Sequence, residues 1–272
     1  MNNKPQFPTY FLSHGGGPWP WLEGPFRDAM EKLKISLEEL PKELPEKPRA
    51  ILMISGHWEE EDFKVMSNPH PGMVYDYYGF PEHTYSIKYE APGSPELANQ
   101  VKELIENIGL KSSLDSERGF DHGTFVPLAV SFPQADIPVV QLSLRSDYDP
   151  EVHFKVGQAL APLRREGVLI IGSGLSYHNL RMFNASAMKP SREFDHWLQE
   201  VILKTPPEKR LEKLKSWHLA PSARLAHPRE DHLIPLMVAV GAAENDNAQL
   251  CYHEDDLLGG ITVSSFRFGG LF

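Results

Sequence analysis

Three short apolar runs, each leading to a histidine, constrain the fold of this 272-residue chain most strongly. The runs are VLII at 168–171, TYFLS at 9–13 and AILMI at 50–54. Each has the length of a buried strand and is too short for a helix. Glycine follows in every case, and His178, His14 and His57 lie close to it. Because open α/β sheets bind ligands beyond the carboxyl ends of their strands, we expect these histidines to share one site.

The remaining segments alternate between strand-like and helix-like patterns, which indicates an α/β fold. The clearest helix is expected at 95–108, where Ser94 provides an N-cap and Gly109 a stop. The other expected helices span 25–40, 124–132, 150–166, 191–203 and 233–243. The expected strands span 8–13, 49–55, 63–67, 137–144, 168–171 and 260–268. We predict a single domain over 1–272, with a mainly parallel or mixed central sheet flanked by helices.

The stretch from 68 to 92 has neither helical nor strand periodicity and is rich in proline, glycine and tyrosine. A loop of this length inside a compact chain is usually functional or disordered. Its aromatic content argues against disorder, since aromatic side chains favour burial. These residues are Tyr75, Tyr77, Tyr78, Phe80 and Tyr85. We expect the stretch to form a lid or a pocket wall.

Composition excludes several classes of partner and site. The formal net charge is −10 and no block of lysine and arginine stands out, so neither nucleic acid nor an anionic membrane is expected as a partner. Cys251 is the only cysteine, which leaves nitrogen and oxygen as the ligands for any metal. The N-terminus lacks a signal-peptide pattern, and no apolar run approaches ~18 residues. We expect a cytoplasmic protein.

Five of the twelve histidines stand at the edges of apolar elements, next to glycine or at a helix start. They are His14, His57, His122, His178 and His232. Any one of them alone reads equally well as a buried structural histidine. Together they favour a metal site, because three or four neutral imidazoles suit zinc, iron or copper. The HExxH zinc motif is absent, so the site must be assembled from distant segments. His227, before Pro228, is expected to brace a turn.

Three other catalytic or binding motifs fit poorly. GSGLS at 172–176 is not the GxSxG elbow of serine hydrolases, because its last position is Ser176 and not glycine. The three glycines at 15–17 lack the GxGxxG spacing of a dinucleotide site. No P-loop GK[ST] occurs.

Taken together, the motifs resemble those of the class III extradiol ring-cleavage dioxygenases, in the branch that includes 4,5-DOPA dioxygenase. The matching segments occur in the family's order and span nearly the whole chain. They are SHGGGP (13–18), SGHW (55–58), PGSPELA (92–98), GFDHGTF (119–125), IPVVQLSL (137–144), GSGLSYHNLR (172–181) and HPREDHLIPL (227–236).

The resemblance implies one α/β domain with a mononuclear non-haem Fe(II) site, a site that Zn(II) can also occupy. His14 and His57 match the family's two histidine ligands. The third position falls at His232, where Glu230 and Asp231 are nearby carboxylates that could contribute instead. His178 matches the catalytic acid–base histidine and is also a candidate fourth ligand. His122 matches a second active-site histidine that faces the substrate.

The resemblance also implies the reaction. A small catechol, DOPA-like or a catecholic acid, would bind with O2, and its ring would open beside the hydroxyls to give a semialdehyde. A histidine with a pKa near the working pH suits the proton transfers, and His178 is our choice for that role. The pocket walls expected are Trp58, Tyr77, Tyr78 and Phe125. The alternatives are a zinc-dependent hydrolase and a non-enzymatic binding protein on the same fold; the oligomeric state stays open.

Overall fold

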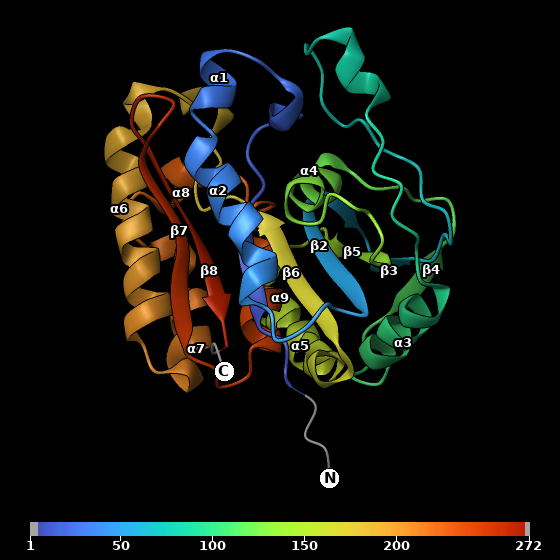
Figure 1. Cartoon of the computed structure of the whole chain (residues 1–272). Coiled ribbons are helices and arrows are strands. Elements are labelled where there is room, and N and C mark those ends of the chain that lie inside the picture. Colours follow the sequence, from blue (N-terminus) through green and yellow to red (C-terminus); the bar gives the residue numbers. More distant parts are fainter. Residues whose placement is uncertain (1–4, 270–272) are drawn as a thin grey trace.

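The computed structural model describes residues 5–269 and contains one mixed β-sheet (Figure 1). Its strand order is β4-β3-β5-β2-β6-β1-β8-β7. The strands are β1 (Thr9–Ser13), β2 (Ala50–Glu60), β3 (Phe63–Met66), β4 (Ser112–Asp115), β5 (Val139–Arg145), β6 (Val168–Gly174), β7 (Ala248–Leu257) and β8 (Ile261–Phe268). The α/β prediction with a mixed sheet is confirmed.

The centre of the sheet is parallel, and both flanks introduce antiparallel pairs. Strands β1, β6, β2 and β5 pair in parallel, whereas β8 runs antiparallel to β1 and β3 antiparallel to β5. Strands β1 and β6 are buried along their full length, as expected where helices cover both faces. Because β1, β6 and β2 run parallel, their carboxyl ends lie together at one end of the sheet.

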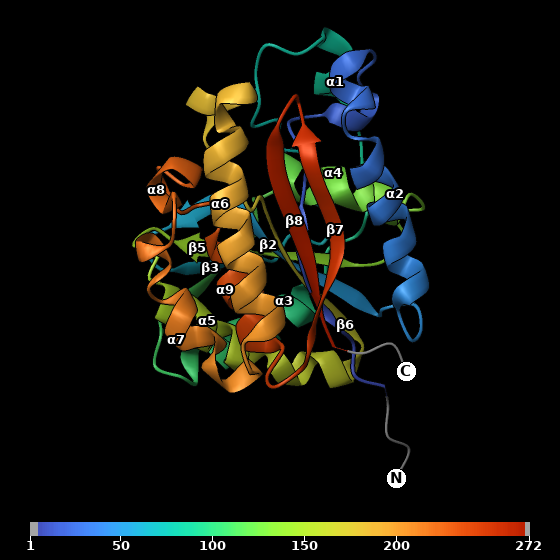
Figure 2. The same ribbon diagram turned by 90° about the vertical axis from the view of Figure 1, so that its left-hand side faces the viewer.

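Helices cover the sheet on both sides. On one face α9 packs on β6 and β1 and against α5, while α6 lies along β8 (Figure 2). On the other face α4 packs on β2 and against α2 (Figure 1). The bounds are α1 (Pro25–Asp28), α2 (Glu31–Glu39), α3 (Pro95–Glu106), α4 (His122–Ser131), α5 (Pro150–Leu160), α6 (Met188–Gln199), α7 (Arg210–Leu214), α8 (Ala223–Ala226) and α9 (Ile234–Ala242).

Several element boundaries differ from the sequence expectations. The helix expected at 25–40 is divided into α1 and α2, and the one expected at 150–166 continues as a 3-10 helix after Leu160. Strand β2 extends past the expected end at 55 to Glu60, with a register shift between Ile54 and Glu59 against β5. Strands β4 and β7 were not predicted, because their sequences do not alternate between apolar and polar residues. Both are edge strands, which are often polar.

The stretch from 68 to 92 is irregular apart from the 3-10 turn η3 (Glu82–Ser86). In Figure 1 it rises above the sheet at the same end as α1. Across that end His83 Nε2 lies 3.0 Å from the backbone oxygen of Trp21, which joins the stretch to η1 (Trp19–Trp21). This arrangement is consistent with the lid or wall expected from the sequence.

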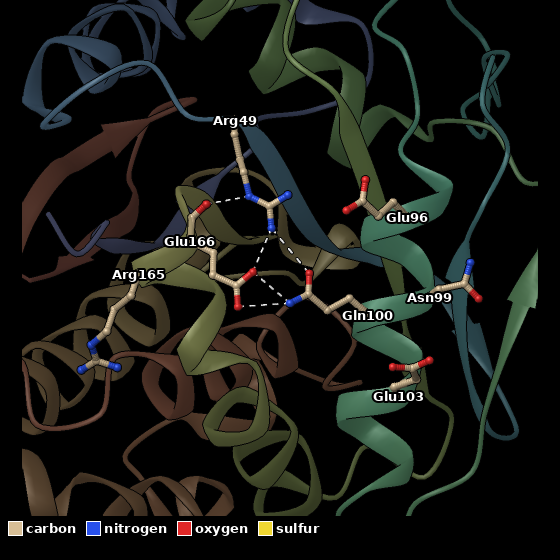
Figure 3. A pocket seen from close by; sticks show the side chains of 7 residues that line it. All are labelled: Arg49, Glu96, Asn99, Gln100, Glu103, Arg165 and Glu166. Atoms are coloured by element: carbon tan, nitrogen blue, oxygen red, sulfur yellow. Dashed lines mark hydrogen bonds and ion pairs between the residues drawn. The ribbon is translucent and has the colours of Figure 1, made fainter. Parts of the chain in front are cut away.

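A polar hollow of about 590 Å³ lies at the opposite end of the strands, beside the start of β2 (Figure 3). Two of its side chains bind the Glu166 carboxylate. Arg49 contacts Glu166 at 3.1 Å, and Gln100 donates to the same carboxylate at 2.9 Å. These contacts tie α3 to the chain between α5 and β6. Among residues 5–269, none of the helices is long and apolar enough to cross a membrane.

Candidate metal centre

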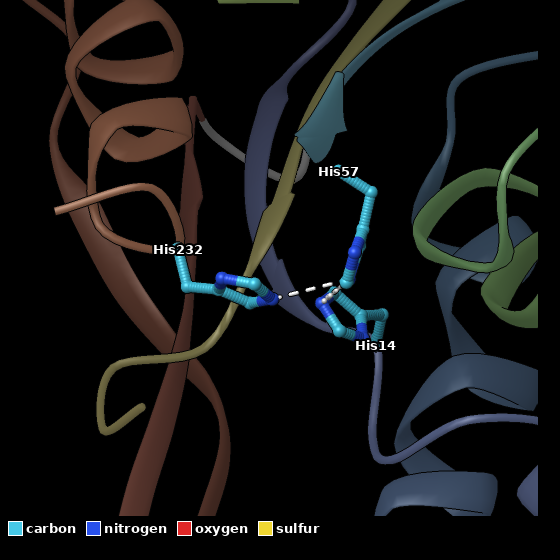
Figure 4. Close-up of side chains that lie close together, drawn as sticks. All are labelled: His14, His57 and His232. Carbon is cyan, nitrogen blue, oxygen red and sulfur yellow. Dashed lines mark hydrogen bonds between the residues drawn. The ribbon is translucent and has the colours of Figure 1, made fainter. Parts of the chain in front are cut away.

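Three histidines from distant segments converge at the carboxyl edge of the sheet (Figure 4). His14 follows β1, His57 lies near the end of β2, and His232 precedes α9. Their Nε2 atoms face one another, with His57 3.3 Å from His14 and 3.1 Å from His232. His14 and His232 are buried, while the side chain of His57 is 18% exposed. The sequence expectation that these three residues meet is therefore met in the fold.

Glycine at the end of β6 allows the segment carrying His232 to approach the sheet. The backbone N–H of Leu175 donates to the carbonyl of His232 at 3.1 Å, and that of His14 donates to Gly174 at 3.1 Å. A Cβ on Gly174 would collide with the carbonyl oxygen of His232. Only glycine fits this close backbone approach, so Gly174 belongs to the framework of the site.

A shared hydrogen-bond network joins β2 to the start of α4. The Ser55 hydroxyl donates to Asp121 at 2.7 Å and accepts from the backbone N–H of His57 at 3.2 Å. Asp121 is buried and is also paired with Arg118 at 2.8 Å. Because Asp121 immediately precedes His122, the network fixes His57 and His122 relative to each other.

Two carboxylates lie beside the Nδ1 atoms of two of these histidines. Asp76 Oδ2 is 3.1 Å from His57 Nδ1, and Asp231 Oδ2 is 3.0 Å from His232 Nδ1. An ionised carboxylate only accepts hydrogen bonds, so each one favours the tautomer with a proton on the facing Nδ1. Their Nε2 atoms then present lone pairs toward each other, an arrangement that a cation between them would stabilise.

The spacing and chemistry of the Nε2 atoms fit a metal ion. Nitrogen ligands about 2.0–2.1 Å from a zinc-like ion lie roughly 3 Å apart, as the Nε2 atoms do here. The protonation state matters as well, because an imidazole must be neutral to bind a metal ion. Burial and the neighbouring histidines hold the pKa of His14 and of His232 well below the ordinary value. For His57 burial acts the same way, but Asp76 outweighs it and raises the pKa.

The other two predicted histidines lie beside this set. The His178 ring is stacked on His232, with centroids 3.4 Å apart and 17° between planes. The His122 ring centroid is 3.9 Å from that of His57, and burial lowers its pKa. His178 groups with Asp231 and His232, outside the triangle of Nε2 atoms. All five histidines singled out in the sequence are therefore brought together.

The two carboxylates considered as alternatives to His232 have other partners. Glu230 is paired with Arg224 at 3.0 Å. Asp231 lies against the imidazoles of His232 and His178, which hold its pKa below the usual range despite partial burial. His232, and neither carboxylate, groups with His14 and His57.

The four predicted wall residues lie in different surroundings. Tyr77 is buried with its ring centroid 5.7 Å from that of His122, and Phe125 is buried in α4. Trp58 is also buried, but its indole donates to Glu60 at 2.9 Å and lies under Arg118. The fourth is Tyr78, which is 92% exposed. Of the four, Tyr77 lies beside a histidine of the site, whereas the ring of Phe125 packs near Trp21 and Tyr75.

The fold also shows what His227 and the two serines of the GSGLS segment contact. His227 is buried with Nε2 2.9 Å from the backbone oxygen of Ser176, so it braces the chain just before His178. The hydroxyl of Ser173 donates to the Gly123 carbonyl, and Ser176 Oγ accepts from Ser264 N at 2.8 Å. Both serines are thus engaged with backbone groups, an arrangement that does not suit a hydrolase nucleophile.

Asp76 was not predicted from the sequence as a residue of the site. This residue lies in the irregular stretch, where no periodicity marks the direction of a side chain. The available signal was a lone carboxylate within the aromatic run VYDYY. A charged residue there needs a partner, but the sequence does not name the partner.

Comparison with known proteins agrees with this geometry. Residues 8–263 match the family described as the catalytic LigB subunit of aromatic ring-opening dioxygenase. The chain is 43% identical over 266 residues to a protein of Beta vulgaris named 4,5-DOPA dioxygenase extradiol, with 96% of each protein covered. A protein of the same name from Escherichia coli K12 is 30% identical, with 97% of this chain and 95% of that protein covered.

A solved crystal structure shows the same fold. It is of an uncharacterized Escherichia coli K12 protein, 29% identical, with a TM-score of 0.77; 97% of this chain and 100% of that chain are covered. The family match, the near full-length relatives and the converging histidines lead to one conclusion. This chain belongs to the LigB family of class III extradiol dioxygenases, in the 4,5-DOPA dioxygenase branch, and is a metal-dependent ring-cleaving dioxygenase.

Proposed function

We propose that this enzyme uses Fe(II) to open the ring of a small catechol with O2, giving a semialdehyde. The observation that carries the proposal is the triangle of Nε2 atoms with two further imidazoles beside it. The relatives named 4,5-DOPA dioxygenase point to a catechol with an amino-acid side chain or a related catecholic acid as the substrate.

His14, His57 and His232 would hold the metal. When bound, ferrous iron supplies the Lewis acidity and O2 chemistry that amino-acid side chains lack. Three neutral imidazoles leave the full positive charge of the ion uncompensated by its ligands. A catecholate would be attracted to that charge, which favours an anionic bidentate substrate over a neutral one.

His178 would move protons, and His122 would contact the substrate or O2. We assign His178 as the residue that removes a proton from a catechol hydroxyl and returns it during ring opening. Its side chain is 17% exposed, and the Asp231 carboxylate 3.8 Å from Nδ1 can stabilise the imidazolium form. His122 donates its Nδ1 proton to Asp76, which leaves Nε2 as its remaining polar atom for substrate or O2. A role for His178 as fourth ligand stays a prediction.

Tyr77 and Phe125 would shield the reacting groups from water. Tyr77 is fixed by a hydrogen bond of 2.6 Å from its hydroxyl to the Thr84 carbonyl, so its ring is a rigid surface beside His122. Trp58 and Tyr78 stay predictions as substrate contacts. A cytoplasmic location likewise stays a prediction from the sequence.

The test is oxygen consumption by protein reconstituted anaerobically with Fe(II) and offered a panel of catechols. We expect uptake with the formation of a yellow product, and loss of both in His178→Ala. Absence of uptake with every catechol, in protein with iron bound, would contradict the proposal. Cleavage of an ester or amide by the Zn2+-loaded protein, without oxygen uptake, would instead support a zinc-dependent hydrolase.

A further inference from the structure

One carboxylate contacts both a metal-ligand histidine and a reactive histidine. Asp76 Oδ1 accepts from His122 twice, from Nδ1 at 2.8 Å and from the backbone N–H at 3.1 Å. Asp76 Oδ2 lies 3.1 Å from His57 Nδ1. The two carboxylate oxygens are therefore divided between two imidazoles from different elements, β2 and α4.

The backbone holds Asp76 in this position although its segment has no regular structure. Val74 N–H donates to the carbonyl of Phe120 at 2.7 Å, which sets the segment beside the start of α4. On either side of Asp76, Tyr75 donates its hydroxyl to the Ile87 carbonyl and Tyr77 donates to that of Thr84, each at 2.6 Å. These anchors limit the movement of the carboxylate.

Asp76 is also electrostatically suited to this role. Each carboxylate oxygen faces an imidazole nitrogen, Oδ1 that of His122 and Oδ2 that of His57. The residue as a whole is exposed, but its side chain is only 21% exposed, so most of the carboxylate is shielded from water. The carboxylate can therefore fix the same Nδ1–H tautomer on both rings.

Asp231 provides an internal comparison. It lies 3.0 Å from His232 Nδ1 and 3.8 Å from His178 Nδ1, so it also stands between a ligand and a reactive histidine. Neither contact is a hydrogen bond, because one atom of each, His232 Nδ1 and Asp231 Oδ1, has no hydrogen-bond partner. Asp76 is thus the more firmly engaged of the two carboxylates.

We propose that Asp76 is a positioning residue that orients His57 toward the metal and His122 toward the substrate at the same time. This inference rests on the proposed function for the role of His122, whereas the effect on His57 is independent of it. Replacing the carboxylate by an amide keeps the volume of the side chain. It replaces one acceptor by an NH2 donor, so only one of the two imidazoles can keep its acceptor.

The experiment compares Asp76→Asn with the unaltered chain by Zn2+ competition titration and by the visible spectrum of the Co2+ form. We expect Zn2+ affinity to fall about 10- to 100-fold, as measured for residues that orient ligand histidines. The Co2+ absorption should also shift, because the orientation of His57 changes. Glu82→Gln, an exposed carboxylate of the same segment, is the matched control and should match the unaltered chain in both measurements.

A second pair of variants separates the two imidazoles. In a His122→Asn background, Asp76→Ala should still weaken Zn2+ binding, because it removes the oxygen that faces His57 Nδ1. If Asp76→Asn lowers the thermal midpoint too far for titration, Asp76→Ser serves as the smaller replacement. Zn2+ affinity within threefold of the unaltered chain and an unchanged Co2+ spectrum would overturn the proposal. These readouts need no turnover, so failure of the enzyme to consume oxygen would count against the proposed function alone.

Discussion

The imidazole of His178 lies nearly flat on that of His232, with ring centroids 3.4 Å apart and 17° between the planes. One ring belongs to the proposed ligand set and the other to the proposed proton-transfer residue. The Nε2 atoms of His14, His57 and His232 form the triangle without His178. Metal binding and proton transfer are therefore assigned to separate residues that touch.

This separation predicts the behaviour of His178→Gln. We expect kcat to fall about 10²- to 10⁴-fold, the usual contribution of a general acid–base group. Zn2+ affinity should stay within about threefold, since the ligand triangle is intact. Steady-state kinetics and competition titration measure the two effects. A large loss of Zn2+ affinity would mean that His178 is a fourth ligand.

Replacing one of the three histidines of the triangle should weaken Zn2+ binding itself, unlike His178→Gln. For His232→Ala we expect Zn2+ affinity to fall by more than about 100-fold, beyond the loss caused by changing a residue that only orients a ligand. His153→Ala, a buried histidine elsewhere, is the control for loss of an imidazole as such. Equal Zn2+ affinity in His232→Ala and the unaltered chain would assign the third ligand to Asp231 or Glu230.

Gly174→Ala tests the close approach between β6 and the segment carrying His232. The added Cβ meets the carbonyl oxygen of His232, so the two backbones must separate. We expect a loss of about 1–3 kcal/mol in the free energy of unfolding, typical of overpacking, together with weaker metal binding. Gly72→Ala, where a Cβ meets no atom within 4 Å, should change stability little. Denaturant unfolding of both variants makes the comparison, and equal stability of the two would contradict the account.

The central arrangement was predictable from the sequence because three apolar runs ended near histidines. In parallel neighbours such as β1 and β6, strand ends coincide, so the histidines that follow must meet. The length of β2 was harder to predict. Its irregular register after Ile54 places His57 inside the strand, and a bulge of this kind leaves no apolar pattern.

Asp76 and β7 could not be predicted for different reasons. The position of Asp76 depends on long-range backbone contacts such as that between Val74 and Phe120, which no local pattern encodes. Strand β7 is an edge strand with exposed charges, so its sequence resembles a loop. The break between α1 and α2 was missed because the apolar spacing from Phe26 to Leu40 continues across it.

The pH dependence of stability should contain a contribution from His153. Burial lowers the pKa of this histidine to about 4, from an ordinary value of 6.5. Its Nε2 accepts from the backbone N–H of Arg145 at 3.0 Å, so protonation breaks a hydrogen bond. Below about pH 6.5 His153 is protonated in the unfolded chain but not in the folded chain. Its contribution to stability is therefore fully present above that pH and decreases below it.

As the pH falls from about 6.5 to about 4, His153 should cost the fold roughly 3 kcal/mol. His153→Asn removes this titration. We expect the variant to be less stable at pH 8, because the hydrogen bonds change, but to lose less stability on acidification. Urea unfolding of both chains between pH 4 and pH 8 gives the two slopes. Parallel slopes would show that His153 does not titrate as the structure implies.

The most direct test of the central claim is the fate of labelled oxygen. The Fe(II)-loaded enzyme would be supplied with 18O2 and DOPA, and the product would be reduced at once with borohydride, before its aldehyde exchanges with water. We expect mass spectrometry to find two labelled oxygen atoms in the ring-opened product. A product that takes its new oxygen from water, or one with the aromatic ring intact, would contradict it.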